Sequence, residues 1–490
     1  MPARHHRFAI ASIAALGLVA FTGLAQAAGP AAAPARQLSP AVATPKVTGP
    51  ITGGLRGRPE TSADAAMALT HQGYVEQEFF VSGTAKAYGP TTLLLPDGVE
   101  PAPKDGDVSP YQTRLLVRRP ADPSKFSGTV VVEWLNVTTQ GDADPEWVGA
   151  YNRLFIPKGW AWVGVSAQHY GVDGPSPLSQ KSWDPVRYAN QHHPGDLFSY
   201  DIFTQAAKAV VASRLPLAGL HPTEVIGTGD SQSADLMNGY LSGYYKKSLG
   251  VFDGFAPSAG TVTATKVPIP TIWINSMNEA AGGTSRPDTN LLHVWEVAGA
   301  SHADDHAVKE GVVGRYAYDE TGESLASDAV NRTSTRDYQT TSGGAPCPRG
   351  RTNLFPYRYA MPVKYAMLDR WLRKGVPAPV FPRLRKNADG TLATDADGNA
   401  VGGFRMPVLS VPVATYTVAG CGSLDGTSYR FTQARLLQLY PTHVAYVAKL
   451  RAAADRAVRA GLMFAGDEGE MLAIAEGSAI PNVGADTPVG

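Results

Sequence analysis

The stretch Val225-Ile-Gly-Thr-Gly-Asp-Ser-Gln-Ser-Ala234 is the most informative part of this sequence. It begins as a short apolar strand that ends in glycine, and residues from Ser233 to Tyr245 have the apolar spacing of a helix. A serine in the pattern Gly-x-Ser-x-small between a strand and a helix is typical of a nucleophile elbow, whose tight turn requires small residues on both sides. Gly229 and Ser233 are small, although the commoner motif ends in glycine. The pattern therefore predicts Ser231 as a catalytic nucleophile.

The residues around the elbow also indicate where an oxyanion would bind. The start of the helix after Ser231 presents free N–H groups and a favourable dipole to a developing negative charge, beginning with Gln232. A second donor is expected after an earlier strand, and the apolar run Thr129–Leu135 leads into Asn136 and Val137. We therefore expect an oxyanion hole made by the N–H of Gln232 and the N–H of either Asn136 or Val137.

An elbow serine needs an acid and then a histidine later in the chain. The histidines that follow the serine are His293, His302, His306 and His443. His302 lies in the loop after the predicted strand Leu292–Val297, and catalytic groups collect in loops at the carboxyl ends of parallel strands. We therefore predict that His302 is the general base. The alternative is a metal pair, in which His302 and His306 bind one ion with Asp304 or Asp305.

The acid is expected in the loop after the preceding strand, Thr271–Asn275. Glu279 is the first carboxylate in that loop, so we predict that it orients the histidine and stabilises the imidazolium. Asp288 is the next carboxylate and the alternative. A triad of Ser231, Glu279 and His302 works through an acyl-enzyme and needs no cofactor.

The order of apolar segments predicts an α/β fold with a mostly parallel sheet and helices on both faces. The predicted strands are Tyr74–Ser82, Gln112–Arg119, Thr129–Leu135, Trp160–Val165, Glu224–Gly227, Val251–Pro257, Thr271–Asn275 and Leu292–Val297. The predicted helices are Ser199–Leu215, Ser233–Tyr245, a helix through Val363 and Leu372 that Gly375 ends, and two more at about 432–440 and 442–460.

The first residues have the features of a secretory signal peptide. Arg4 and Arg7 precede the apolar run Phe8–Leu24, and Ala25-Gln-Ala27 has the form of a cleavage site. We therefore expect export, either to the periplasm or out of the cell. No second apolar run is long enough to span a bilayer, so no membrane insertion of the mature chain is expected.

The sequence divides into segments of different character. The divisions are a signal peptide at 1–27, a flexible leader at 28–70, a hydrolase-like core at 71–302, an irregular insertion that covers the site at 303–360, a last core helix at 361–375, and a C-terminal region at 376–490. The C-terminal region is expected to contain a hairpin at Asn387–Gly403 and helices packed on the core.

Charge and cysteine content restrict the function further. The sequence holds 43 Lys and Arg against 43 Asp and Glu, so it lacks the basic surplus of a nucleic-acid binder. The cysteines are Cys347 and Cys421, and an exported protein with one such pair favours a disulfide between them. Two buried free thiols are the alternative.

The sequence resembles α/β-hydrolase-fold serine hydrolases, and more narrowly the exported bacterial "alpha/beta hydrolase domain" family. The matching stretches are Glu133–Asn136, His193–Phe203, Gly229–Ala234, Asp253–Phe255, Trp295–His302 and Asp395–Gly403. They are spread over residues from about 74 to 460. The resemblance implies a Ser–acid–His triad and esterase-like activity, and it names no substrate.

Together these features predict an exported serine hydrolase that cleaves carboxylic esters of small molecules. A lactonase or peptidase with the same triad is one alternative, and a non-catalytic binding protein on a hydrolase scaffold is another.

Overall fold

The computed structural model of the chain describes residues 37–61, 63, 68–89, 102–138, 140–264, 267–283, 286–303, 338–340, 346–348, 352–421 and 424–483. Residues 36–490 form one compact unit. The predicted signal peptide and most of the predicted cover, 304–337, lie outside the described residues.

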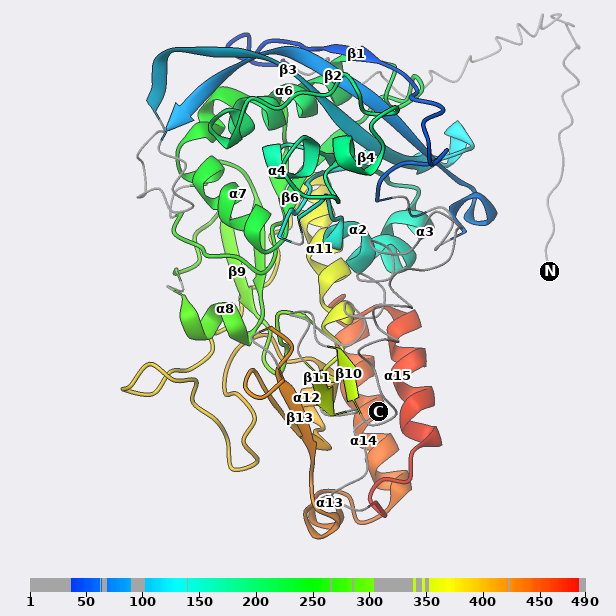
Figure 1. The fold of residues 1–490 in the computed structure, drawn as a ribbon. Coiled ribbons are helices and arrows are strands. Elements are labelled where there is room, and N and C mark those ends of the chain that lie inside the picture. Colours follow the sequence, from blue (N-terminus) through cyan, green and yellow to red (C-terminus); the bar gives the residue numbers. More distant parts are fainter. Residues whose placement is uncertain are drawn as a thin grey trace, which may run out of the picture. The chain divides into compact units, whose positions relative to one another are not determined.

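Within the described chain, nine strands form one sheet in the order β1-β2-β3-β5-β4-β6-β7-β8-β9 (Figure 1). The strands β5, β4, β6, β7, β8 and β9 pair in parallel, whereas β1, β2 and β3 form an antiparallel edge that continues onto β5. Their bounds are Lys46–Thr48 (β1), Tyr74–Gly89 (β2), Ala102–Pro120 (β3), Thr129–Trp134 (β4), Ala161–Val165 (β5), Glu224–Gly229 (β6), Gly254–Phe255 (β7), Thr271–Asn275 (β8) and Leu292–Glu296 (β9). The predicted α/β fold with a mostly parallel sheet is confirmed.

The described helices lie between and after these strands. Their bounds are Pro145–Ala150 (α2), Ile156–Lys158 (α3), His169–Val172 (α4), Gln180–Trp183 (α5), Ser199–Ala212 (α6), Gln232–Ser242 (α7), Met277–Gly282 (α8), Met361–Lys374 (α11), Pro407–Ser410 (α12), Gln433–Leu439 (α13), His443–Arg459 (α14) and Ala465–Gly477 (α15). Two small antiparallel pairs complete the structure: Tyr338–Thr340 (β10) with Pro346–Pro348 (β11), and Ala414–Thr417 (β12) with Thr427–Arg430 (β13).

Helices cover both faces of the sheet, as the continuous apolar strands predict. Every residue of β4 is buried. Val130 and Val132 pack in one apolar cluster with Phe203 of α6 and Met237 of α7. Val131 points the other way, into a second cluster that contains residues of α2 and α11. Because β4 to β9 are parallel, their carboxyl ends meet at one edge of the sheet, and β6 delivers Ser231 there.

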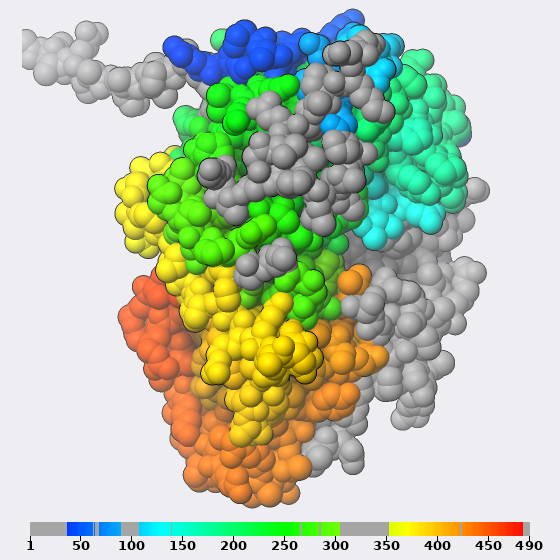
Figure 2. Space-filling view, turned by 90° about the vertical axis from the view of Figure 1, so that its left-hand side faces the viewer, coloured from blue at the N-terminus to red at the C-terminus, as the bar shows by residue number. Residues whose placement is uncertain are grey.

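The C-terminal region packs on the core. Tyr446 and Leu450 of α14 belong to the same buried cluster as Trp295 of β9. The N–H of Phe404 donates to the carbonyl of Glu296 at 2.7 Å, so the chain after α11 runs beside the end of β9. Figure 2 shows the later residues, coloured yellow to red, in contact with the green residues of the core.

The prediction of a flexible leader at 28–70 is wrong for residues 39–48, which are held against the core. Val47 in β1 pairs with Val81 in β2, which adds a strand to the sheet edge. The buried Lys208 donates to the carbonyls of Ser39 and Val42 at 3.0 and 2.5 Å, which fixes the chain before β1. A strand of three residues is too short to show a recognisable alternation of apolar and polar residues. It is held by its hydrogen bonds to the partner strand rather than by a pattern of its own.

The predicted hairpin at Asn387–Gly403 is two separate tight turns. Antiparallel bridges join Lys386 to Leu392 and Thr394 to Ala400, and neither extends into a regular strand. In the second turn, the Asp395 carboxylate accepts the N–H groups of Asp397 and Asn399 at 3.0 Å.

No helix among the described residues is both long enough and apolar enough to cross a membrane.

Candidate active site

Ser231 adopts the strained backbone of a nucleophile elbow. It lies between the last residue of β6, Gly229, and the first residue of α7, with φ 56° and ψ −121°. A non-glycine residue rarely adopts positive φ, and such strain gathers at functional sites. The N–H of Ser231 donates to the carbonyl of Ser258 at 3.0 Å, which holds the turn against the next segment of the sheet.

The two small residues that flank the elbow, Gly229 and Ser233, are each required for a different structural reason. A Cβ at Gly229 would lie 3.1 Å from the backbone of Ser233, so a larger residue would push the helix away from the strand. The Ser233 hydroxyl donates to the carbonyl of Asp230 at 2.8 Å and accepts the Asp230 N–H at 2.9 Å. The serine that replaces the usual glycine therefore satisfies backbone groups of the turn.

His302 and Glu279 form a direct pair. The His302 Nδ1 atom lies 2.5 Å from Oε1 of Glu279, and both side chains are nearly buried. The N–H and the hydroxyl of Ser276 donate to the other carboxylate oxygen at 2.8 and 2.7 Å. The His302 N–H donates to the side chain of Asn278 at 2.9 Å, so the short helix α8 fixes both the carboxylate and the loop that carries the histidine.

The His302–Glu279 pair favours the protonated, imidazolium form of His302. Burial by itself would lower the pKa of His302, but the Glu279 carboxylate outweighs burial and raises the pKa to about 9. Burial would likewise raise the pKa of Glu279, but the charge of His302 and the hydrogen bonds from Ser276 bring it below its ordinary value. The arrangement therefore stabilises positive charge on the ring that forms when a base accepts a proton.

The charges of this pair act on the two acidic residues that flank Ser231, Asp230 and Asp235. Burial and Glu146 raise the pKa of Asp230, the residue before Ser231, to about 7, while His302 acts on it in the opposite direction. Asp235, on the first turns of α7, is also affected by the charges of Glu279 and His302. The structure thus brings the three predicted triad residues to one edge of the sheet.

The predicted oxyanion donors are not equivalent. The N–H of Asn136 donates to the carbonyl of Ala143 at 2.9 Å, and its side-chain amide donates to the carbonyl of Asp230. The N–H of Val137 faces the side-chain oxygen of Gln232 at the long distance of 3.4 Å. The Gln232 N–H begins α7 and has no carbonyl one turn earlier within that helix. Val137 and Gln232 are therefore the better placed donors.

The family description "Alpha/beta hydrolase domain" matches residues 47–473, which is most of the sequence. The protein belongs to this family. No curated protein sequence matches it.

Solved structures with similar chains include esterases and peptidases. The esterase Est22 matches with a TM-score of 0.26 and 12% identity, over 44% of this chain and 67% of its own. A structure from a study of two prolyl endopeptidases matches with a TM-score of 0.25 and 10% identity, over 46% and 35%. A putative acetyl xylan esterase from Bacteroides fragilis has a TM-score of 0.24 and 9% identity, over 41% and 59%. These similarities are too weak to bear on activity.

The alternative residues in this alpha/beta hydrolase have other tasks or lie outside the described chain. Asp288 accepts the N–H of Val294 at 2.7 Å and pairs with Arg383 at 2.8 Å, so it supports the end of the sheet. His293 is buried and stacks on Trp371. The metal alternative involves residues 304–306, which are not described, and among the described residues no group of three His, Cys, Asp or Glu side chains could hold a metal ion.

A buried ion pair that could not be recognised from the sequence stabilises the turn that carries Ser231. Lys364 of α11 is fully buried and lies 2.7 Å from both carboxylate oxygens of Glu146. Lys364 also donates to the hydroxyl of Ser258, whose carbonyl accepts the Ser231 N–H. Burial lowers the pKa of Lys364, and the Glu146 carboxylate opposes that effect. A charged network thus joins α2, α11 and the nucleophile turn.

The C-terminal region also reaches the site. The N–H of Ala303 donates to the carbonyl of Leu424 at 3.2 Å, which places the β12–β13 turn beside the histidine loop. The next residue, Asp425, is buried, and its charge is one of those that raise the pKa of His302. A pattern in the sequence could not show this contact, because more than a hundred residues separate the two loops.

Proposed function

We propose that this protein is an exported serine hydrolase that cleaves carboxylic esters of small molecules through an acyl-enzyme. The observation that supports it most is the strained Ser231 at the start of α7, with the His302–Glu279 pair beside it. Membership of the alpha/beta hydrolase family agrees with hydrolytic chemistry. Export rests on the signal-like sequence at 1–27.

In the proposed mechanism, Nε2 of His302 accepts the hydroxyl proton of Ser231 while the serine oxygen attacks the ester carbonyl. Glu279 stabilises the resulting imidazolium through Nδ1. The tetrahedral intermediate collapses when the imidazolium gives its proton to the leaving alcohol, which leaves an acyl group on Ser231. His302 then deprotonates a water molecule that attacks the acyl group, and the carboxylic acid departs as Ser231 regains its proton.

The N–H groups of Gln232 and Val137 would stabilise the oxyanion in both steps. The Val137 N–H now faces the side-chain oxygen of Gln232 at 3.4 Å, a contact long enough to be given up for a substrate oxygen. The side-chain amide of Gln232 also donates to the side-chain oxygen of Gln168 at 3.1 Å, so the Gln232 side chain does not depend on the Val137 contact alone. We therefore assign Val137, rather than Asn136, to the oxyanion hole.

A substrate panel tests this function. Purified mature protein should hydrolyse at least one of short-chain, long-chain or aromatic esters, with the rate unchanged by EDTA. Hydrolysis of lactones or peptides alone, through Ser231, would favour the lactonase or peptidase alternative. If no substrate is turned over and Ser231 does not react with an acylating probe, the binding-protein alternative is the better account.

The pH profile should report the His302–Glu279 pair. The base must be neutral, so kcat/KM should rise with pH up to the pKa of His302, near 9. Glu279→Gln removes the charge that raises this pKa, and the rise should move to lower pH. The same variant should lose roughly 10²–10⁴-fold in kcat, less than the roughly 10⁴–10⁶-fold expected for His302→Ala. An unchanged profile in Glu279→Gln would show that Glu279 is not the acid.

A disulfide between Cys347 and Cys421 is proposed for the exported protein. Cys421 is buried next to the β12–β13 turn, whereas the side chain of Cys347 lies outside the described residues. Reduction should lower the free energy of unfolding by about 2–4 kcal/mol and the melting temperature with it, because the reduced unfolded chain is less restricted. Alkylation of the native protein followed by mass measurement checks this, and two alkylated thiols would contradict it.

A further inference from the structure

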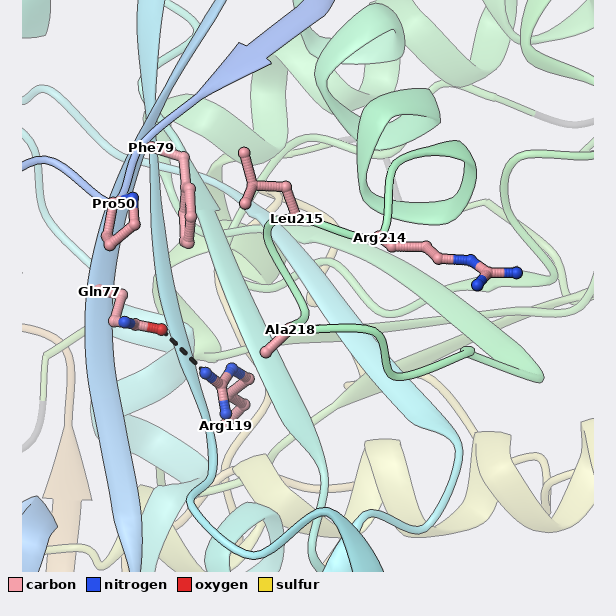
Figure 3. Close-up of a pocket in the computed structure, with 7 residues that line it drawn as sticks. All are labelled: Pro50, Gln77, Phe79, Arg119, Arg214, Leu215 and Ala218. Atoms are coloured by element: carbon pink, nitrogen blue, oxygen red, sulfur yellow. Dashed lines mark hydrogen bonds between the residues drawn. The ribbon is translucent and has the colours of Figure 1, made fainter.

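A hollow of about 470 Å³ lies on the antiparallel edge of the sheet, away from the proposed catalytic site. Its lining residues are Pro50, Gln77, Phe79, Arg119, Arg214, Leu215 and Ala218 (Figure 3). Arg118, the residue before Arg119 in β3, lies opposite Trp162 near the start of β5 in the strand register. The hollow is therefore near the amino ends of the parallel strands, whereas Ser231 follows the carboxyl end of β6.

Arg119 is the unusual residue in this lining. It is only 8% exposed, and its Nη2 group donates to the side-chain oxygen of Gln77 at 2.8 Å. Its Nη1 group donates to the carbonyl of Pro120 at 3.2 Å, and among the described residues Nε has no hydrogen-bond partner. Burial lowers the pKa of Arg119, and no carboxylate in the described part of the chain counters that effect.

Other arginines of the same strand are neutralised. Arg114 lies within 3.1 Å of the carboxylates of Glu60, Glu78 and Asp142. Arg118 pairs with Glu76 and Asp144. Within the described residues no such pair involves Arg119. Since a buried cation is costly unless it is paired, the protein keeps at this position a charge that an external anion could neutralise.

The walls of the hollow are apolar. Figure 3 shows the side chains of Pro50 and Leu215 on either side of the Phe79 ring, with Arg119 below them. Leu215 is 40% exposed, whereas Phe79 is only 2% exposed and forms the floor. The guanidinium of Arg214 points away from the other labelled side chains, so one cation rather than two serves the hollow (Figure 3). A single cation suits a monoanion, and the apolar walls suit a hydrocarbon tail.

We propose that this hollow binds a small monocarboxylate with an apolar tail, whose carboxylate pairs with the Arg119 guanidinium and whose tail packs between the exposed side chains of Pro50 and Leu215. An arginine fork matches the planar geometry of a carboxylate. The volume is within the range of small-molecule sites. Binding here is separate from ester cleavage and does not require the triad.

Calorimetric titration of the full mature chain with octanoate tests the proposal. Octanoate should bind the wild-type protein and the Ser231→Ala variant equally. Arg119→Gln should weaken binding at least about tenfold, since a hydrogen-bonded charge pair is lost. Arg459→Gln, a matched change of an exposed arginine at the end of α14 that does not line the hollow, should leave affinity unchanged. Octanamide and inorganic phosphate, which lack the charge and the tail respectively, should bind far more weakly than octanoate.

The result does not depend on the stability of one variant. Leu215→Glu changes an exposed side chain, so it should preserve the fold while its charge repels the carboxylate and weakens octanoate binding by about tenfold. Absence of octanoate binding to the wild-type protein, or equal affinity in Arg119→Gln, would overturn the proposal. Phosphate binding as tight as octanoate binding would also overturn it, because the apolar walls would then play no part.

Discussion

Ser231→Ala should reduce kcat for ester hydrolysis by roughly 10⁴–10⁶-fold, as large a loss as is expected for His302→Ala. The reason is that the hydroxyl oxygen forms the acyl-enzyme, and alanine removes it without filling new space. The backbone of the elbow is held by the bond from the Ser231 N–H to Ser258, which alanine keeps. Steady-state rates with the best ester from the substrate panel measure the effect.

The matched control is Ser124→Ala, which changes an exposed serine at the opposite edge of the sheet, before β4. Its rate should equal that of the wild-type protein, and the thermal unfolding of both variants should resemble that of the wild type. A Ser231→Ala protein that is folded and retains its rate would contradict the assigned nucleophile.

Lys364→Met should lower the free energy of unfolding by about 3–5 kcal/mol. Methionine fits the fully buried position in volume, but it leaves the buried Glu146 carboxylate without the ammonium group at 2.7 Å. It also removes the donor to Ser258, which supports the nucleophile turn. Chemical unfolding measures the loss of stability, and the activity of the folded variant should fall as the turn loosens.

Two further variants isolate the charge. Lys374→Met, at the exposed end of the same helix, should change stability by no more than about 0.5 kcal/mol. Combining Lys364→Met with Glu146→Gln should recover part of the loss, because the amide no longer carries the buried charge. A loss below about 1 kcal/mol in Lys364→Met would mean that the pair does not support the elbow.

Much of the central sheet could be predicted from the sequence, because strands buried on both faces are continuous apolar runs. β8 has its predicted bounds, Thr271–Asn275, and β9 ends one residue early. The predicted strand Val251–Pro257 shrinks to Gly254–Phe255, since these two residues pair with β6 and only Phe255 also pairs with β8. β1 was not predicted because its three residues are held as a strand only by pairing with β2. α15 was not predicted because its glycines and scattered acidic residues interrupt the apolar pattern of a helix.

The residues of the proposed triad could be selected from the sequence for a similar reason. Parallel strands bring their following loops together, so the first carboxylate after one strand and the histidine after the next were strong expectations. Lys364, Glu146 and Asp425 had no such signal. Each is an ordinary charged residue in sequence, and burial and charge appear only when α2, α11 and the β12–β13 turn pack around the elbow. The choice of Val137 over Asn136 likewise depends on where one N–H already donates.

The most direct test of the account is covalent labelling of the full mature chain with a fluorophosphonate, followed by peptide mass mapping. One adduct is expected, on Ser231. It should form more slowly as the pH is lowered and His302 becomes protonated, and hardly at all in His302→Ala. An unlabelled protein, or an adduct on any other residue while Ser231 stays free, would contradict the claim that Ser231 and His302 form the catalytic centre.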